Sequence, residues 1–216
     1  MTVQRVLVTG FEPFGGETIN PSWDVAQALH GQVRSGAGIT AVQLPCAFAT
    51  ALPALRAAIR RHRPQLVISL GLAGSRSAIS LERVAVNLCD ARIPDNAGAQ
   101  PVGLPVVAGG PAAYFTRLPV KALLQRLQAA GLPAELSLSA GSFVCNQVMY
   151  GLLHALRRQP GVAAGFIHLP PLPAQAVAHP GSRPLALAEQ VRALELVVDA
   201  LLPGLAELQV PGGRTD

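Results

Sequence analysis

The sequence contains few charged and few aromatic residues. Only 13% of its 216 residues are charged and 4% are aromatic, whereas 50% are hydrophobic. A chain of this length buries roughly 70% of the surface that its unfolded form exposes, so it needs neither disulfides nor a structural metal to fold. Glycine and proline, at 21 and 19 residues, stay below the level typical of low-complexity disorder. We expect one globular domain at residues 1–210 and a frayed tail at 211–216.

Lysine is nearly absent, because Lys121 is the only one among 17 basic side chains. The other basic residues are arginines, scattered except for one cluster, Arg56, Arg60, Arg61 and Arg63. No aromatic residues alternate with this cluster, as they do in many nucleic-acid-binding surfaces. A solvated helix end, favoured by the helix dipole, explains the cluster better than a nucleic-acid patch. We therefore expect no nucleic-acid partner.

Long uninterrupted hydrophobic runs are also missing. The charge-free stretches at 96–116, 136–156 and 159–182 contain prolines, glycines or polar side chains that are unsuited to a membrane span. Near the N-terminus, the apolar run after Arg5 ends at Thr9, which is too short for a signal peptide. The expectation is a soluble cytoplasmic protein with no membrane partner.

Cysteine and histidine are too few and too scattered for a disulfide framework or a metal site. Cys46, Cys89 and Cys145 cannot all pair, and no CxxC motif occurs. The five histidines show no HxxxH spacing. We expect reduced thiols and no bound metal.

Hydrophobic periodicity predicts strands that alternate with helices. Strands are expected at residues 3–9, 39–45, 65–71, 84–88, 135–138 and 163–169. Helices are expected at residues 23–31, 47–62, 120–130, 143–158 and 185–202. This alternation predicts an α/β fold with a mainly parallel sheet covered by helices on both faces. The long connections at 93–119 and 170–184 are candidates for binding loops or subunit contacts.

The segment GFEPFGG, residues 10–16, follows the first expected strand, where phosphate-binding loops occur. A P-loop requires Lys and Ser or Thr where this chain has Gly16 and Glu17. The segment instead presents Phe11 and Phe14 near the carboxyl edge of the sheet, where ligands bind in open α/β folds. By themselves, such phenylalanines are more often core residues than ligand-binding ones.

Cys145 lies in the first turns of the helix expected at 143–158. A helix N-terminus lowers the pKa of a cysteine, as does a neighbouring imidazolium, and the thiolate is the nucleophilic form. We therefore expect a lowered pKa if Cys145 is reactive. The alternative is a small buried hydrophobic residue, as is expected for Cys46 and Cys89.

His168 ends the strand expected at 163–169, so it also falls at the carboxyl edge of the sheet. A base at this position can reach Cys145, and nucleophilic cysteine catalysis requires such a base and a third group that orients it. Glu82 is one candidate for that third group, because a charge beside an apolar strand needs a partner. Spacing alone does not rank it against the other acidic candidates, Asp90, Asp95 and Glu12.

Four blocks of the sequence, taken together, resemble the pyroglutamyl-peptidase I (pyrrolidone-carboxylate peptidase) family. These cysteine peptidases remove an N-terminal pyroglutamyl residue from peptides. The blocks are VLVTGFEPFGG with the following INPSW, then GSRSAISLERVAVNLCDARIPDNAG, SAGSFVCNQVMYGLLHAL and FIHLPPLPAQ. The resemblance implies that Cys145 is the nucleophile, that His168 is the base and later the acid, and that Glu82 orients His168. It also implies a single-domain α/β/α sandwich, no cofactor, a cytoplasmic location and a homotetramer.

The resemblance further implies a site for the lactam ring. Arg92 would assist amides at the start of the Cys145 helix in stabilising an oxyanion. Phe14 and Phe143 would sandwich the ring. The remaining apolar wall would comprise Phe11, Ile93 and Val144.

Leu72 departs from the family pattern, which usually has GQAG where this chain has GLAG. If the family contacts the substrate through the backbone at this position, little is lost. If the glutamine side chain makes the contact, affinity falls by roughly 1 to 3 kcal/mol because a lactam group stays unpaired. We predict an active enzyme with a raised KM.

Two other functions remain as alternatives to catalysis. A non-catalytic module could bind pyroglutamyl ligands on the same fold, as the substitution at Leu72 would suggest. A redox-responsive protein could use Cys145 with Cys46 or Cys89 as a resolving thiol.

Overall fold

The most apolar segments of the chain form the middle of one sheet. The computed structural model describes residues 4–212. In it, β3 (Ala37–Leu44), β1 (Gln4–Phe11), β4 (Leu66–Leu72) and β9 (Ala163–Leu169) are neighbours in that order. Each of these strands runs parallel to the next. Nearly every residue of β1, β4 and β9 is buried, as expected for parallel strands covered on both faces.

Shorter strands complete the sheet at both edges. β5 (Ile79–Glu82) runs antiparallel to β9, and β8 (Ala134–Ser137) lies parallel to β5 at the edge. β2 (Val33–Arg34) pairs antiparallel with β3 at the opposite edge. The sheet therefore has seven strands in the order β2-β3-β1-β4-β9-β5-β8 and is mainly parallel.

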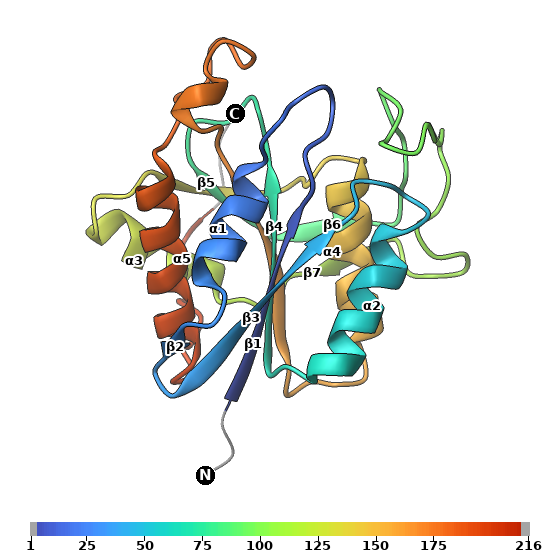
Figure 1. Ribbon diagram of the computed structural model, residues 1–216. Coiled ribbons are helices and arrows are strands. Elements are labelled where there is room, and N and C mark those ends of the chain that lie inside the picture. The colour runs from blue at the N-terminus through green and yellow to red at the C-terminus, as the bar shows by residue number, and fades with distance from the viewer. Residues whose placement is uncertain (1–3, 213–216) are drawn as a thin grey trace.

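Helices cover both faces of the sheet (Figure 1). One face carries α1 (Pro21–Leu29), α3 (Val120–Ala129) and α5 (Leu187–Leu201), and the other carries α2 (Ala51–His62) and α4 (Val144–Ala155). Each layer has its own apolar core against the sheet. The predicted single-domain α/β/α sandwich is confirmed.

The alternation of side chains along each strand decides which layer a residue faces. In β1, Val6 and Val8 pack in the core under α1 and α5, whereas Leu7 and Phe11 pack under α2 and α4. The same alternation in β9 places Phe166 on the α4 side. His168, two residues further along, therefore points to the same side as α4.

The strand predicted at 84–88 is present at Val84–Val86, but it lies outside the central sheet. The central sheet uses β5 instead, and β6 (Val84–Val86) pairs with β7 (Ala113–Phe115) in a separate two-stranded sheet. Because both Ser80 and Glu82 are buried in β5, its polar positions concealed it as a core strand. The first predicted strand and the tail at 211–216 extend past the described residues, at position 3 and at 213–216.

A close contact fixes the chain where β1 leads into α1. A Cβ on Gly10 would lie only 2.2 Å from the carbonyl oxygen of Ser22, so only glycine lets α1 come this close. Asn20 caps the helix by accepting a hydrogen bond from the Ser22 amide at 3.1 Å. This junction anchors the loop 12–19 above the sheet. Within residues 4–212, no helix is long and apolar enough to cross a membrane.

Candidate active site

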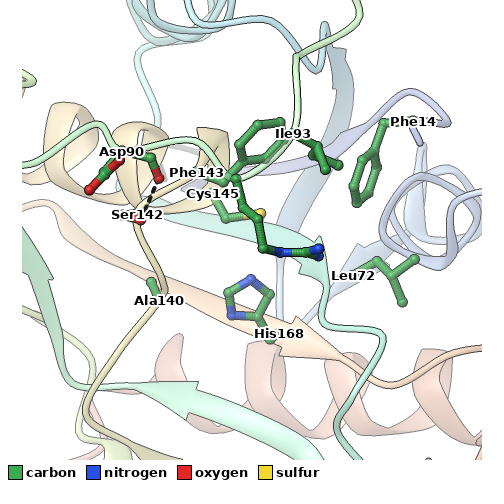
Figure 2. A pocket seen from close by; sticks show the side chains of 10 residues that line it. Phe14, Leu72, Asp90, Ile93, Ala140, Ser142, Phe143, Cys145 and His168 are labelled. Carbon is green, nitrogen blue, oxygen red and sulfur yellow. Dashed lines mark hydrogen bonds between the residues drawn. The ribbon is translucent and has the colours of Figure 1, made fainter. Parts of the chain in front are cut away.

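A cavity of about 260 Å³ opens beside the carboxyl ends of β4 and β9, next to the N-terminus of α4 (Figure 2). Its position follows from the parallel strands, whose carboxyl ends and following loops meet at one edge. The residues that line it are Phe14, Leu72, Asp90, Arg92, Ile93, Ala140, Ser142, Phe143, Cys145 and His168.

Cys145 is the second residue of α4 and reaches back over the sheet toward β4. A Cβ on Gly71 would lie 2.8 Å from its Sγ. Gly71 is also the register partner of His168 across the β4–β9 ladder. The thiol is therefore seated beside the histidine, and Figure 2 shows both side chains at the same cavity.

Glu82 supports His168 from behind the cavity. Its Oε1 lies 2.7 Å from Nδ1 of His168, and its side chain is fully buried. An ionised carboxylate can only accept a hydrogen bond, which places the imidazole hydrogen on Nδ1 and leaves Nε2 free to act as a base. Glu82, His168 and Cys145 thus come together from β5, β9 and α4.

The rival acidic residues have other partners. Asp95 accepts hydrogen bonds from the amides of Phe48, Ala97 and Ala99. Glu12 accepts from the amide of Cys46 and the side chain of Asn96. Both acids tie together the loops around the cavity, and neither contacts His168. Asp90 lines the cavity, but only Glu82 among the four candidates is hydrogen-bonded to the histidine.

Burial raises the pKa of the Cys145 thiol above its usual value. The neighbouring Cys46 and the charge of Glu82 act in the same direction, whereas Arg76 and a hydrogen bond to the backbone of Cys145 oppose the shift. The lowered pKa expected from the helix N-terminus is therefore wrong. The raised pKa favours the neutral thiol, which must lose its proton to a base before or during attack.

The start of α4 supplies donors for a developing negative charge. The helix begins at Val144, so the amides of its first turn have no carbonyl one turn behind them. Arg92 lines the same cavity and carries a positive charge at neutral pH. Arg92 and the start of α4 thus both adjoin the cavity that Cys145 lines.

Comparison with known proteins assigns the family. A family model described as pyroglutamyl peptidase matches residues 4–203. The chain belongs to the pyroglutamyl peptidase family. It is 53% identical over 213 residues to the pyrrolidone-carboxylate peptidase of Erwinia tasmaniensis, covering 99% of this chain and 100% of that one. It is 54% identical over 210 residues to the Klebsiella pneumoniae protein of the same name, covering 97% and 98%.

Solved structures of the family have the same fold. The pyroglutamyl peptidase I of Bacillus amyloliquefaciens superposes with a TM-score of 0.91 at 42% identity, covering 95% of this chain and 100% of that one. A mutant pyrrolidone carboxyl peptidase of Pyrococcus furiosus gives 0.89 at 40% identity, covering 94% and 100%. The pyroglutamyl peptidase family is thus shown by sequence and by structure.

Two residues assigned to the pocket wall lie elsewhere. Phe11 is only 2% exposed and packs against Phe166, with ring centroids 6.5 Å apart. Val144 is fully buried in the core beneath α4. Neither lines the cavity, because the side-chain direction in β1 and at the start of α4 turns both into the interior. They support the wall from below.

The two predicted ring-flanking aromatics do face each other. The ring centroids of Phe14 and Phe143 lie 6.2 Å apart with an interplanar angle of 35°. Phe48 packs edge-on against Phe143 at 5.2 Å and holds it. Phe14 and Phe143 thus lie next to each other on the cavity wall.

Sequence reasoning missed several groups around the site. Nothing in the sequence pointed to Gly71 except its place at the end of an expected strand. Arg76, which contacts Glu82, was not predicted as a site residue, although it lies in the family-like block that begins GSRSAISLE. Asn146 is fully buried and bonds to the backbone of Val86 and Leu88, which attaches α4 to the loop that carries Arg92. In the sequence, the place of Asn146 directly after Cys145 was the one indication that it belongs to the site.

Proposed function

We propose that this protein hydrolyses the bond after an N-terminal pyroglutamyl residue of peptides, with Cys145 as nucleophile, His168 as base and Glu82 as the residue that orients His168. The observation that carries the proposal is the 2.7 Å contact between Glu82 and His168, with Cys145 beside them at the same cavity. Membership of the pyroglutamyl peptidase family supports the substrate class. Residues 1–210 would form the single catalytic domain.

The first half of the reaction forms a thioester. His168 accepts the thiol proton at Nε2 as Sγ attacks the pyroglutamyl carbonyl carbon, which leaves the negative charge on the carbonyl oxygen. Amides at the start of α4 and the Arg92 side chain stabilise this oxyanion, and each such donor contributes roughly 3 to 4 kcal/mol. The C–N bond then breaks, and the imidazolium donates its proton to the leaving amine.

The second half releases the product. Water takes the place of the departed amine, and His168 removes a proton from it as it attacks the thioester carbonyl. A second oxyanion forms in the same position and collapses with departure of sulfur. The proton on His168 returns to Cys145, so the free thiol is restored and pyroglutamate leaves. Throughout, Glu82 holds the Nδ1 hydrogen and stabilises the imidazolium that forms twice.

The cavity suits a small neutral ring. Its wall combines aromatic and aliphatic side chains, Phe14, Leu72, Ile93 and Phe143. Apolar contacts of this kind bury the ring, while a few polar groups fix its orientation. A pyroglutamyl ring carries no free amine, so no acidic side chain is needed to hold a charge. Leu72 cannot donate or accept a hydrogen bond with its side chain, so lactam recognition at this position is left to the backbone.

We further propose a cytoplasmic homo-oligomer, a tetramer as the family resemblance implies, with neither nucleic acid nor membrane as partner and with no cofactor. Exposed apolar side chains support subunit contacts. Phe115 on β7 is 71% exposed, and Val102 and Leu104 in the preceding loop are 74% and 55% exposed. Light scattering in solution would give the molar mass, and a monomer at all concentrations would contradict this part.

The redox alternative is disfavoured by the other thiols. Burial, together with the charges of Glu12 and Asp95, raises the pKa of Cys46 to about 12, and burial raises that of Cys89 to about 11. Neither provides the thiolate that a redox switch needs at neutral pH. A binding module without catalysis would not require the buried contact between Glu82 and His168.

The proposed function is tested by substrate selectivity. The protein is incubated with a chromogenic amide of pyroglutamate and with the matching prolyl amide, whose ring has a methylene in place of the lactam carbonyl and therefore a basic amine in place of the lactam N–H. We expect release of the chromogenic amine from the pyroglutamyl compound and little from the prolyl one. Binding of the pyroglutamyl compound without turnover, in a folded and reduced sample, would favour the non-catalytic module.

A further inference from the structure

The buried carboxylate of Glu82 accepts two hydrogen bonds on one oxygen. Oε1 lies 2.7 Å from Nδ1 of His168 and 2.6 Å from Nη1 of Arg76. Among the described residues, its other oxygen has no hydrogen-bond partner. Arg76 and His168 therefore share the same acceptor atom, and the negative charge that faces His168 is also bound to a guanidinium.

Arg76 also reaches the loop that precedes the nucleophile. Its Nη2 donates to the carbonyl oxygen of Ser139 at 2.8 Å, five residues before the helix that carries Cys145 begins at Val144. Its own amide donates to the carbonyl of Ala73 at 3.0 Å. One planar side chain thus links the β4–β5 connection, the acid on β5 and the loop before α4. Lysine cannot match this fork, because its single nitrogen is a point charge.

The shared oxygen has an electrostatic consequence for the base. A carboxylate hydrogen-bonded to an imidazole stabilises the charged form of the ring. A guanidinium on the same carboxylate oxygen reduces that stabilisation. The other titratable groups that line the cavity beside His168 are Asp90, Arg92 and Cys145. Among the described residues, Arg76 is the one arginine or lysine that forms an ion pair with Glu82.

We propose that Arg76 is a positioning residue that acts through Glu82: it holds the carboxylate against His168 and keeps the imidazole free to accept a proton at neutral pH. This inference rests on the proposed function for its catalytic meaning. Its physical content, the protonation equilibrium of the Glu82–His168 pair, exists whether or not the protein turns over a peptide.

Three variants separate the effect of the Arg76 charge from the effect of its two side-chain contacts. Arg76→Gln removes the charge, Arg76→Lys keeps the charge without the second contact to Ser139, and Arg83→Gln is the matched control. Arg83 also borders the groove that contains Arg76, but no described side-chain contact joins it to Glu82. Because Arg76 is 22% exposed, its replacement leaves no sealed cavity in the core.

Two readouts are measured across pH. The first is kcat/KM for the pyroglutamyl amide. The second is the rate of alkylation of Cys145 by iodoacetamide, located by mass spectrometry, which needs the same base but no turnover. For Arg76→Gln we expect the acidic limb of both profiles to move to higher pH by roughly 1 unit, because a positive charge has left the pair. Arg76→Lys keeps the wild-type limb with a lower kcat/KM, and Arg83→Gln matches the wild type in both.

The proposal is overturned if the acidic limbs of Arg76→Gln coincide with those of the wild type, or if Arg83→Gln moves them equally. If Arg76→Gln does not fold, Arg76→Lys remains decisive, since a displaced limb in that variant contradicts the proposal. A wild type that alkylates at Cys145 with the expected limb but hydrolyses no pyroglutamyl amide would refute the proposed function and leave the role of Arg76 intact.

Discussion

The Sγ of Cys145 lies where a side chain on Gly71 would have to go. A Cβ at that position would be 2.8 Å from Sγ and 2.8 Å from the Phe166 ring. Gly71 is paired with His168 in the β4–β9 register. The space left by the missing side chain of Gly71 therefore lies beside the imidazole of His168. The approach of α4 to the sheet, and with it the pairing of thiol and imidazole, depends on this missing side chain.

Replacing Gly71 with alanine should therefore displace Cys145 or Phe166. We expect kcat/KM for the pyroglutamyl amide to fall by at least about 100-fold, the loss typical of a reacting group displaced by about 1 Å. The free energy of unfolding should fall by about 1 to 3 kcal/mol from overpacking. Enzyme kinetics and urea unfolding measure the two effects.

Gly38→Ala is the matched control for this substitution. Gly38 lies in β3, which is separated from β4 by β1, and a Cβ there would meet nothing within 4 Å. It should keep wild-type activity and stability. Full activity in Gly71→Ala would show that α4 can shift without harm and that the close approach is not needed.

The direction of the Cys145 pKa predicts a neutral thiol in the resting enzyme. Because burial raises this pKa, the thiolate should be scarce at pH 7 and should accumulate only above the usual value near 8.5. The test is the ultraviolet absorbance of the thiolate, taken as the difference between wild type and Cys145→Ser at each pH. A thiolate signal already present at pH 6 would indicate a preformed ion pair with His168 instead.

Leu72→Gln tests how the lactam is recognised. Leu72 lines the cavity and is 6% exposed, so a glutamine there would place an amide against the substrate ring. If the side chain of the usual glutamine makes a contact, KM should fall by roughly tenfold, equivalent to one hydrogen bond of about 1.4 kcal/mol, with kcat little changed. Unchanged KM and kcat would show that the backbone alone suffices and that Leu72 is no defect.

An ion pair far from the site predicts a measurable pH dependence of stability. Arg34 at β2 donates two hydrogen bonds to Asp199 on α5. The hydrogen bond with Arg34 lowers the pKa of Asp199, burial opposes the shift, and the charge of Arg34 adds to it. A lowered carboxyl pKa stabilises the fold above the unfolded value near 3.9, and that contribution is lost as pH falls through the folded value.

Asp199→Asn should therefore cost stability at pH 7 and little at pH 2.5. The side chain of Asp199 is 35% exposed, so solvent screening limits the expected difference to about 1 kcal/mol or less. Urea unfolding at both pH values measures it. Glu195→Gln, which removes only a single contact to Arg34, should have a smaller effect. An equal loss at both pH values would mean that the pair acts through packing rather than charge.

The sequence pattern predicted the parallel strands at the centre of the sheet. The positions of His168 and Cys145 at one edge of that sheet follow from those strands. The buried runs of β4 and β9 have a clear pattern, and His168 and Cys145 fall at a strand end and a helix start, where α/β folds place their sites. The strand that carries Glu82 was missed, because Ser80 and Glu82 are polar yet buried. Burial of a charged residue is explained only by its partners, which come from distant segments.

The directions of side chains were also beyond the sequence. Phe11 and Phe14 are three residues apart, but Phe11 turns into the core at the end of β1 while Phe14 faces the cavity from the following loop. The direction of the Cys145 pKa was mispredicted for a related reason. Its helix position could be seen in the sequence, whereas the extent of its burial depends on Gly71, Phe166 and the layers packed around them.

The most direct test compares the wild type with Cys145→Ser on the chromogenic pyroglutamyl amide, after circular dichroism has shown that both are folded. A serine keeps the size of the side chain but is a far weaker nucleophile in this setting. We expect turnover by the wild type, lost by several orders of magnitude in Cys145→Ser. Equal turnover by the two proteins, or none by the folded and reduced wild type, would contradict the assignment of Cys145 as the nucleophile of a pyroglutamyl peptidase.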